Sequence, residues 1–397
     1  MSNVKNKTVI IAFVLMIAAF IVVLALPADK ESIEAENRVM STVPPLDSDT
    51  VFSGQFASGF ESFIGDSIGF RSFFTPLAKQ LEDKKGFTPD TGKIISTNKD
   101  IGTGTTQKQT LLMVNNSIME MFMRNPQHEQ LYADTINHYA ESLPESISLY
   151  SMIIPTQLEF QEPMYKNLQD SQKAAIDSIY EKLDGNVTAV DAYGALAPHR
   201  DEYIYFRTDH HWTPLGAYYA YREFMNANGG NAVNKDDFEA NRIQNVLGYL
   251  YDRVDNPEIA ANPDTIEWYD VDPDNRLDIS MHDTDENGNP TTYNGTMYDR
   301  TKANYLFFFG SDHPVVEMTN DDIPDGKTLV VLKDSYSNVL APWLINSYHK
   351  VVMVDPRIYR GNFRNIIDNY SPDEVLIVNY IFTTNFPDYC NMLKNMY

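Results

Sequence analysis

The four residues at 209–212 read DHHW, in a chain of 397 residues that holds only eight histidines. A Thr-Pro pair follows and is typical of a helix start, because threonine caps free N–H groups and proline loses no hydrogen bond there. In an extended segment residues i and i+2 share a face, so we expect Asp209 to pair with His211 while His210 points elsewhere. A carboxylate that orients an imidazole in this way prepares it to act as a general base.

An imidazole base needs a nucleophile, and Ser335 is the best candidate. It follows a buried apolar strand, 328–332, and precedes a helical stretch. A turn between a strand and a helix exposes a nucleophile and aims backbone N–H groups at the oxyanion formed during acyl transfer. Pro342 lies too deep for an unbroken helix from Tyr336, so we expect a longer or kinked turn.

Both segments also have a purely structural interpretation. The DHHW segment would then be a packing corner, with Trp212 buried and His211 hydrogen-bonded. Asp334 and Ser335 would form a simple helix N-cap, a role for which both residue types are well suited. The residues alone leave these interpretations open.

Metal binding is a third interpretation of the Asp-x-His pair. Such sites need further acids at strand ends, and Asp191 and Asp355 both end predicted strands. The acidic segment 283–294 begins like a calcium loop, but Asn294 occupies the place of the bidentate glutamate and Pro290 interrupts the loop. We interpret that segment as a turn, and we predict no metal and no other cofactor.

Short apolar strands alternate with helices around these candidate residues. The predicted strands are 147–156, 187–191, 328–332, 351–355 and 375–380, and the predicted helices are 128–142, 170–183 and 362–369. This alternation favours an α/β fold, a parallel sheet flanked by helices, over residues 101–397. Within it, the aspartate-rich region at about 231–325 is predicted to be an insertion or loops rather than core.

The N-terminus carries an uncharged apolar run, 8–27, preceded by two lysines. Such a run predicts a transmembrane helix with a cytoplasmic N-terminus, although a cleaved signal peptide is the alternative. We expect a membrane anchor over 1–27, a stalk and helical region over 28–100, and a single-pass cell-membrane protein whose main domain lies outside the cytoplasm. The net charge of −24 disfavours nucleic acid as a partner, and one cysteine, Cys390, cannot form an internal disulfide.

The chain resembles the DHHW proteins, relatives of the SGNH-hydrolase-like domains of the alginate O-acetyltransferases. The matching segments are 36-ENR-38, Asp66 with Arg71, 152-MIIPT-156, 208-TDHHWTPLGAYYAY-221, 333-KDSYSNVLAPWL-344 and 354-VDPRIY-359. The resemblance implies that Asp209 orients His211, that His211 deprotonates Ser335, and that Ser335 carries the acyl group. It also implies an SGNH-hydrolase-like sheet in the permuted order, with Asp and His before Ser.

The same resemblance suggests the remaining site residues and the activity. Tyr336, Arg357 and Asn379 are our candidates for contacts to the oxyanion or the substrate. The implied activity is O-acyl transfer, in particular O-acetyl transfer to an extracellular polysaccharide, beside a membrane-bound O-acyltransferase as partner. An acetyl esterase with the same triad and a non-catalytic polysaccharide-binding or assembly protein are the alternatives.

Overall fold

The structure is a computed structural model that describes residues 92–100, 106–254, 256–284 and 289–397, with Val43, Pro45, Leu46, Phe56, Phe60 and Phe63 as isolated positions. The predicted anchor, and most of the predicted stalk and helical region, lie outside the described residues. No helix among the described residues is both long enough and apolar enough to span a bilayer. Asp90–Tyr397 form one compact unit, which contains the candidate residues.

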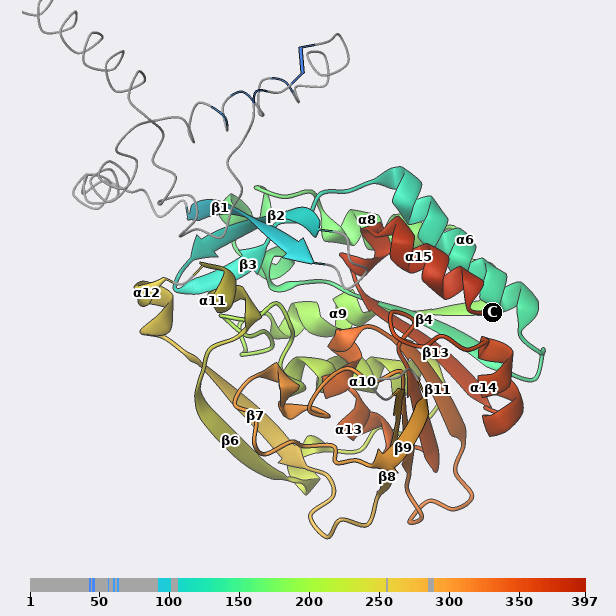
Figure 1. The fold of residues 1–397 in the computed structure, drawn as a ribbon. Helices are drawn as coiled ribbons and strands as arrows, with labels where there is room; N and C mark the ends of the chain where they lie inside the picture. Colours follow the sequence, from blue (N-terminus) through green and yellow to red (C-terminus); the bar gives the residue numbers. More distant parts are fainter. Residues whose placement is uncertain are drawn as a thin grey trace, which may run out of the picture. The chain divides into compact units, whose positions relative to one another are not determined.

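An eight-stranded sheet forms the centre of this unit, with the strand order β5-β4-β13-β11-β12-β10-β8-β9 (Figure 1). The strands are β4 Ser148–Ile154, β5 Val187–Val190, β8 Asp278–Thr284, β9 Pro290–Asn294, β10 Val315–Thr319, β11 Thr328–Lys333, β12 Lys350–Val354 and β13 Glu374–Tyr380. The strands from β5 to β12 pair in parallel, and β10, β8 and β9 continue the sheet antiparallel. The prediction of an α/β fold with a largely parallel sheet is confirmed.

Helices cover both faces of the parallel strands (Figure 1). One face packs against α6 Pro126–Ser142, α8 Gln172–Tyr180, α14 Phe363–Tyr370 and α15 Pro387–Asn395, and the other against α9 Ala192–Leu196, α10 Pro214–Ala227 and α13 Ala341–Leu344. Leu329 and Val331 of β11 pack on the α10 side, whereas Val330 and Leu332 pack on the α6 side. Successive side chains of a strand point to opposite faces, so a strand buried on both sides must be apolar throughout.

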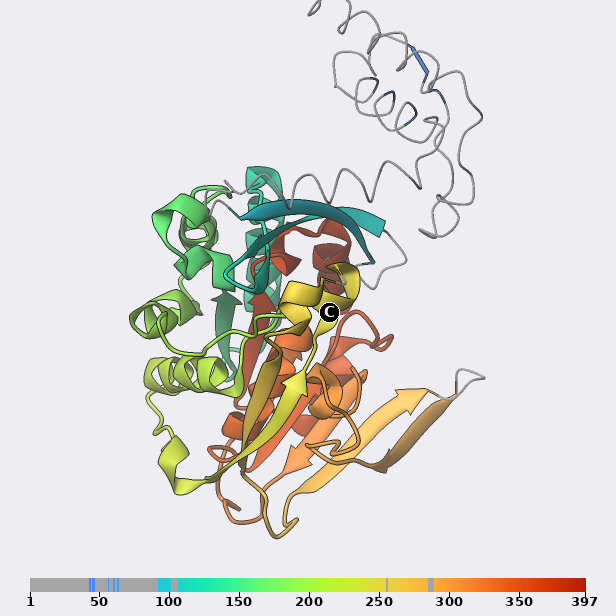
Figure 2. The ribbon, with the colours of Figure 1, turned by 90° about the vertical axis from the view of Figure 1, so that its left-hand side faces the viewer.

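The aspartate-rich region differs from the predicted insertion or loops, because β8, β9 and β10 extend the central sheet. Figure 2 shows the β8–β9 hairpin projecting from the edge of that sheet. The calcium-like segment begins and ends on this hairpin, and residues 285–288, which include the predicted turn, lie outside the described residues. Two more strands, β6 Glu239–Val246 and β7 Asp264–Asp270, form a separate antiparallel ribbon. Edge strands and ribbons expose one face to water, so their composition resembles that of loops.

Residues 93–100 also differ from the prediction, which assigned them to the end of a helical region. They form β1 Lys93–Asp100, which pairs with β2 Thr106–Val114 and, through it, with β3 Ser117–Glu120. Apolar residues of β2 and β3 pack against α11 Tyr249–Val254 and α12 Pro257–Ala260. This small sheet therefore supports the segment around residue 249, which contributes to the candidate site.

Candidate active site

Ser335 lies where β11 ends and a short 3₁₀ helix, Ser335–Val339, begins. Asp334 caps this helix, because its side chain accepts a hydrogen bond from the N–H of Tyr336 (3.0 Å). A second short helix, α13, starts at Ala341, so the broken helix that Pro342 predicts is confirmed. Ser335 is the one residue of 329–345 that is not buried.

The DHHW segment packs against this serine turn through reciprocal hydrogen bonds. The fully buried indole of Trp212 donates its N–H to the carbonyl oxygen of Tyr336 (2.8 Å). In return, the Tyr336 hydroxyl donates to the carbonyl oxygen of His210. Thr213 then caps α10 through a hydrogen bond from the N–H of Gly216 (3.3 Å), as its position before proline predicts. These hydrogen bonds fix the position of the DHHW segment relative to the serine turn, although the two segments are far apart in the sequence.

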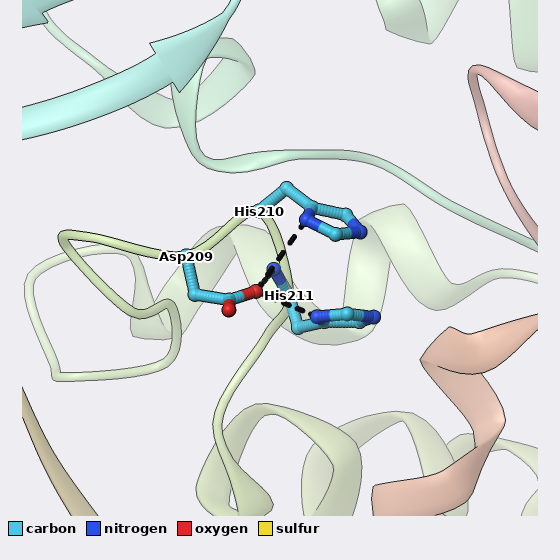
Figure 3. Close-up of side chains that lie close together, drawn as sticks. All are labelled: Asp209, His210 and His211. Carbon is cyan, nitrogen blue, oxygen red and sulfur yellow. Dashed lines mark hydrogen bonds and ion pairs between the residues drawn. The ribbon is translucent and has the colours of Figure 1, made fainter. Parts of the chain in front are cut away.

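Asp209, His211 and Ser335 form one continuous hydrogen-bonded chain. His211 Nε2 lies 2.9 Å from Ser335 Oγ, and His211 Nδ1 lies 2.6 Å from Asp209 Oδ1. Figure 3 shows the carboxylate and the His211 ring facing one another. With the ring proton on Nδ1, directed at the carboxylate, Nε2 is able to accept the proton of the serine hydroxyl. The structure brings together the three residues that the sequence analysis grouped as catalytic.

Asp209 pairs with His211 as predicted, but the two residues lie in a turn and not in the extended segment that the sequence predicts. Its Oδ1 accepts the backbone N–H of His211 (3.0 Å) as well as the ring, and its Oδ2 accepts the N–H of Tyr249 (2.9 Å). Burial of this carboxyl opposes its ionisation, but the imidazoles of His211 and His210 and the Tyr249 N–H outweigh burial and hold the pKa of Asp209 well below its usual range. The carboxylate is therefore charged whenever the protein is near neutral pH.

His210 does not point away from this pair, and that prediction was wrong. Its Nδ1 lies 3.5 Å from Asp209 Oδ1, and its ring centroid lies 3.9 Å from that of His211 (Figure 3). The reason is the backbone, which bends at each residue of 207–211, so the alternation of an extended strand does not apply.

Asp209, His210 and His211 also satisfy the spacing of a metal site, because one ligand atom from each lies within 4.8 Å of the others. Both ring nitrogens of His211 are already hydrogen-bonded, so a metal ion there would displace the contact to the carboxylate or to the serine. The two strand-end acids do not join the group: Asp191 caps α9, and Asp355 pairs with Lys333 and Arg357. The arrangement fits a proton-transfer chain better than a metal centre.

The chain is similar to known proteins in both sequence and structure. The sequence profile of the DHHW proteins matches residues 82–354. The chain belongs to the DHHW family. The structure is similar to that of a DHHW family protein from Eubacterium siraeum, with 26% identity, a TM-score of 0.63, and coverage of 76% of this chain and 98% of that one. It also shares its fold with Bacillus cereus PatB1, solved with a sulfonyl adduct, at 19% identity and a TM-score of 0.58 over 73% of this chain and 97% of that one. No curated protein matches this chain.

Two residues that hold Asp209 in this DHHW protein were not found from the sequence. A Cβ added to Gly248 would meet the Cβ of Asp209 and would lie 2.7 Å from its Oδ2, so only glycine lets the backbone approach the carboxylate. Asp264, at the start of β7, accepts hydrogen bonds from the N–H groups of Arg207 and Thr208 (2.8 Å each) and shapes the turn before Asp209. Neither residue lies in a recognisable motif, since both act across long sequence separations.

The predicted oxyanion or substrate residues of the DHHW protein pair with acidic side chains at and near the serine turn. The Tyr336 N–H is bonded to Asp334, and the Asn379 amide donates to the other oxygen of Asp334 (3.2 Å). Arg357 is paired with two aspartates. These donor groups form hydrogen bonds or ion pairs within the protein, and their contacts to an oxyanion or a substrate stay a prediction.

Lys333, which ends β11, is almost fully buried, and its Nζ contacts three side-chain oxygens. These are Asp312 Oδ1 (3.1 Å), Asn338 Oδ1 (2.9 Å) and Asp355 Oδ2 (3.2 Å). Replacing Lys333 with methionine leaves buried carboxylates with less compensation, so Lys333→Met is expected to lower the free energy of unfolding by about 3 kcal/mol. Guanidinium unfolding of the full chain measures this loss.

Lys173 provides the control, because it forms an ion pair in which both side chains are exposed. Its Nζ lies 2.6 Å from Asp177 Oδ1, and the side chains of Lys173 and Asp177 are 43% and 48% exposed. Lys173→Met is therefore expected to change the free energy of unfolding by less than about 1 kcal/mol. Equal losses for the two variants would contradict the claim that the buried pairing of Lys333 supports the serine turn.

Proposed function

We propose that this DHHW protein is a serine-dependent O-acyltransferase, specifically an O-acetyltransferase that acts on a cell-surface polysaccharide. The observation that carries the proposal is the hydrogen-bonded chain from Asp209 through His211 to Ser335. Such a chain activates a hydroxyl that is otherwise a weak nucleophile at neutral pH. The proposal includes an SGNH-hydrolase-like fold in permuted order, since the acid and the base precede the serine in the chain.

In the first half-reaction, Ser335 Oγ attacks the carbonyl carbon of an acyl ester or thioester while its proton passes to His211 Nε2. The tetrahedral intermediate collapses, the bond to the leaving group breaks, and the leaving group takes the proton from Nε2. Asp209 holds the ring in position and stabilises its transient positive charge throughout. The product is an acyl ester on Ser335.

In the second half-reaction, a sugar hydroxyl gives its proton to His211 Nε2 and attacks the acyl-serine carbonyl. The bond to Ser335 Oγ then breaks, and the serine oxygen recovers the proton from Nε2. If water replaced the sugar hydroxyl, the same steps would make the protein an acetyl esterase. The two activities differ only in which acceptor reaches the acyl-serine.

The proposal extends to location and partners. The apolar run 8–27, with two lysines before it, would anchor the chain in the cell membrane and leave Asp90–Tyr397 outside the cytoplasm. There the protein would receive acyl groups from a membrane-bound O-acyltransferase and pass them to an extracellular polysaccharide. Protease added to intact cells is expected to digest the outer unit, and full protection would contradict this topology.

The test of the activity uses the full-length protein in mild detergent with p-nitrophenyl acetate as the acyl donor. We expect release of nitrophenol and an acetyl group on the peptide that contains Ser335, located by mass spectrometry. Faster loss of that acetyl group with added oligosaccharide would support transfer, and loss to water alone would support the esterase. Absence of an adduct with both this ester and a sulfonyl fluoride would favour the non-catalytic protein, and activity abolished by chelators would favour a metal.

A further inference from the structure

Tyr305 contacts both His211 and the serine turn, although it comes from the aspartate-rich region. It lies in a short 3₁₀ helix, Tyr305–Phe307, and is buried. Its ring is stacked on that of His211, with centroids 3.5 Å apart and planes inclined by 3°. Its hydroxyl donates a hydrogen bond to the carbonyl oxygen of Ser335 (2.7 Å) and lies 3.2 Å from that of Tyr336.

The stacked ring restricts the one motion of His211 that its hydrogen bonds leave free. Nδ1 and Nε2 lie in the plane of the ring, and they must reach Asp209 and Ser335 at the same time. A flat aromatic neighbour at van der Waals distance opposes tilting of this plane. The hydroxyl of the same tyrosine fixes the backbone from which Ser335 Oγ projects.

The segment that carries Tyr305 is itself tied to the serine turn. Asn304 caps its 3₁₀ helix by accepting the N–H of Leu306 (3.0 Å). Further along, Asp312 accepts hydrogen bonds from Lys333 (3.1 Å) and from the Asn338 amide (3.0 Å), which flank Ser335 on either side. The segment that contains Tyr305 is therefore hydrogen-bonded to the serine turn, which Tyr305 itself contacts.

We propose that Tyr305 is a positioning residue for acyl transfer, whose ring sets the plane of His211 and whose hydroxyl sets the position of the Ser335 turn. This inference rests on the proposed function of the site. Burial raises the pKa of the Tyr305 hydroxyl well above its usual range, so the group remains a donor at any pH at which the reaction runs.

Two substitutions separate the two contacts in the full-length protein. Tyr305→Phe keeps the stacked ring and removes the hydroxyl, so we expect the saturating rate of Ser335 acetylation by p-nitrophenyl acetate to fall about tenfold. Tyr305→Leu removes both contacts, and we expect a fall of about a hundredfold. The half-saturation concentration is expected to stay unchanged in both variants, because Tyr305 acts through His211 and Ser335 and not on the reagent.

Tyr139→Phe is the matched control. Tyr139 is also a buried tyrosine whose hydroxyl donates to a main-chain carbonyl, that of Leu393 (2.6 Å), but it packs on the opposite face of the sheet. Removing the Tyr139 hydroxyl breaks a similar hydrogen bond and should leave the acetylation rate unchanged. An equal fall in Tyr139→Phe would mean that general destabilisation explains the effect, which would overturn the inference.

The second readout is independent of activity. The proton on Nδ1 of His211, which faces Asp209, is expected to give a downfield NMR resonance in protein labelled at histidine. We expect this signal to persist in Tyr305→Phe and to broaden or disappear in Tyr305→Leu. An unchanged signal in Tyr305→Leu, or unchanged acetylation in both variants, would overturn the positioning role alone. Wild-type protein that forms no Ser335 adduct with either p-nitrophenyl acetate or a sulfonyl fluoride would refute the proposed function, and the NMR comparison would then still decide whether Tyr305 positions the ring.

Discussion

Ser335→Ala is expected to lower acyl turnover by a factor of about 10⁴ or more and to eliminate the acetylated peptide. The substitution removes the Oγ that lies 2.9 Å from His211 Nε2 and leaves the imidazole without a proton to accept. The fold is expected to survive, because Ser335 is not buried and alanine fits the space of serine. Release of nitrophenol and mass spectrometry of the 335 peptide measure the effect, and circular dichroism checks the fold.

Ser311→Ala is a matched control within the same chain. Ser311 Oγ lies 3.2 Å from His313 Nε2, and His313 Nδ1 lies 3.1 Å from Asp283 Oδ2, so the same three residue types occur in the same order of contact. His313 Nε2, however, is also 3.0 Å from the carbonyl oxygen of Phe309, which can only accept a hydrogen bond. A hydrogen bond to this carbonyl requires a proton on Nε2, and an Nε2 that holds a proton cannot take one from Ser311.

Ser311→Ala should accordingly retain full turnover. If it lost activity as Ser335→Ala does, contact between a serine and an aspartate-paired histidine would not identify the nucleophile. If Ser335→Ala kept its turnover while the protein stayed folded, the serine mechanism would be refuted.

Asp209→Asn is expected to lower turnover by a factor of about 10³ to 10⁴ with little change in the position of the ring. Asparagine has nearly the same shape, but it offers no negative charge to the imidazolium, and its amide can turn its N–H groups toward Nδ1. His211 would then place its proton on Nε2, the atom that must accept the proton of Ser335. The acetylation rate of Ser335 at neutral pH measures the loss.

Asp283→Asn is the corresponding control, because Asp283 also pairs with a histidine, with its Oδ2 3.1 Å from His313 Nδ1, and the substitution should not affect turnover. Stability gives a second comparison. Since the pKa of Asp209 is depressed in the folded protein, its ionised form stabilises the fold above the unfolded pKa of about 4, and this contribution is lost as the pH falls through the depressed value. At neutral pH Asp209→Asn should therefore unfold more easily than wild type. Equal turnover in Asp209→Asn and wild type would show that His211 needs no carboxylate partner.

Local patterns in the sequence predicted much of the main unit. The middle of the strand Thr328–Lys333 is buried on both faces and is apolar from Leu329 to Leu332, so its composition indicates a buried strand. The start of α10 was equally clear, because a threonine cap followed by proline satisfies the helix end with neighbouring residues. Strands with one exposed face, such as those of the aspartate-rich region, were missed because their polar composition resembles that of loops.

The candidate site divides in the same way. Asp209, His211 and Ser335 could be selected from residue type, spacing and the strand that precedes the serine, because acid, base and nucleophile are chemical properties of single side chains. The turn that pairs Asp209 with its histidine, the glycine that admits the Tyr249 N–H and the stacked ring of Tyr305 depend on the tertiary structure.

Asn379 is a case in which the sequence predicted the strand but not the hydrogen-bond partner. It falls within the predicted strand 375–380, which the structure shows as β13, and its amide donates a hydrogen bond to Asp334. A strand position determines which residues are neighbours, whereas the hydrogen-bond partner of a buried amide depends on every group packed around it. The sequence by itself therefore determined which groups could perform the chemistry, and only the tertiary structure decided how each of them is oriented and held.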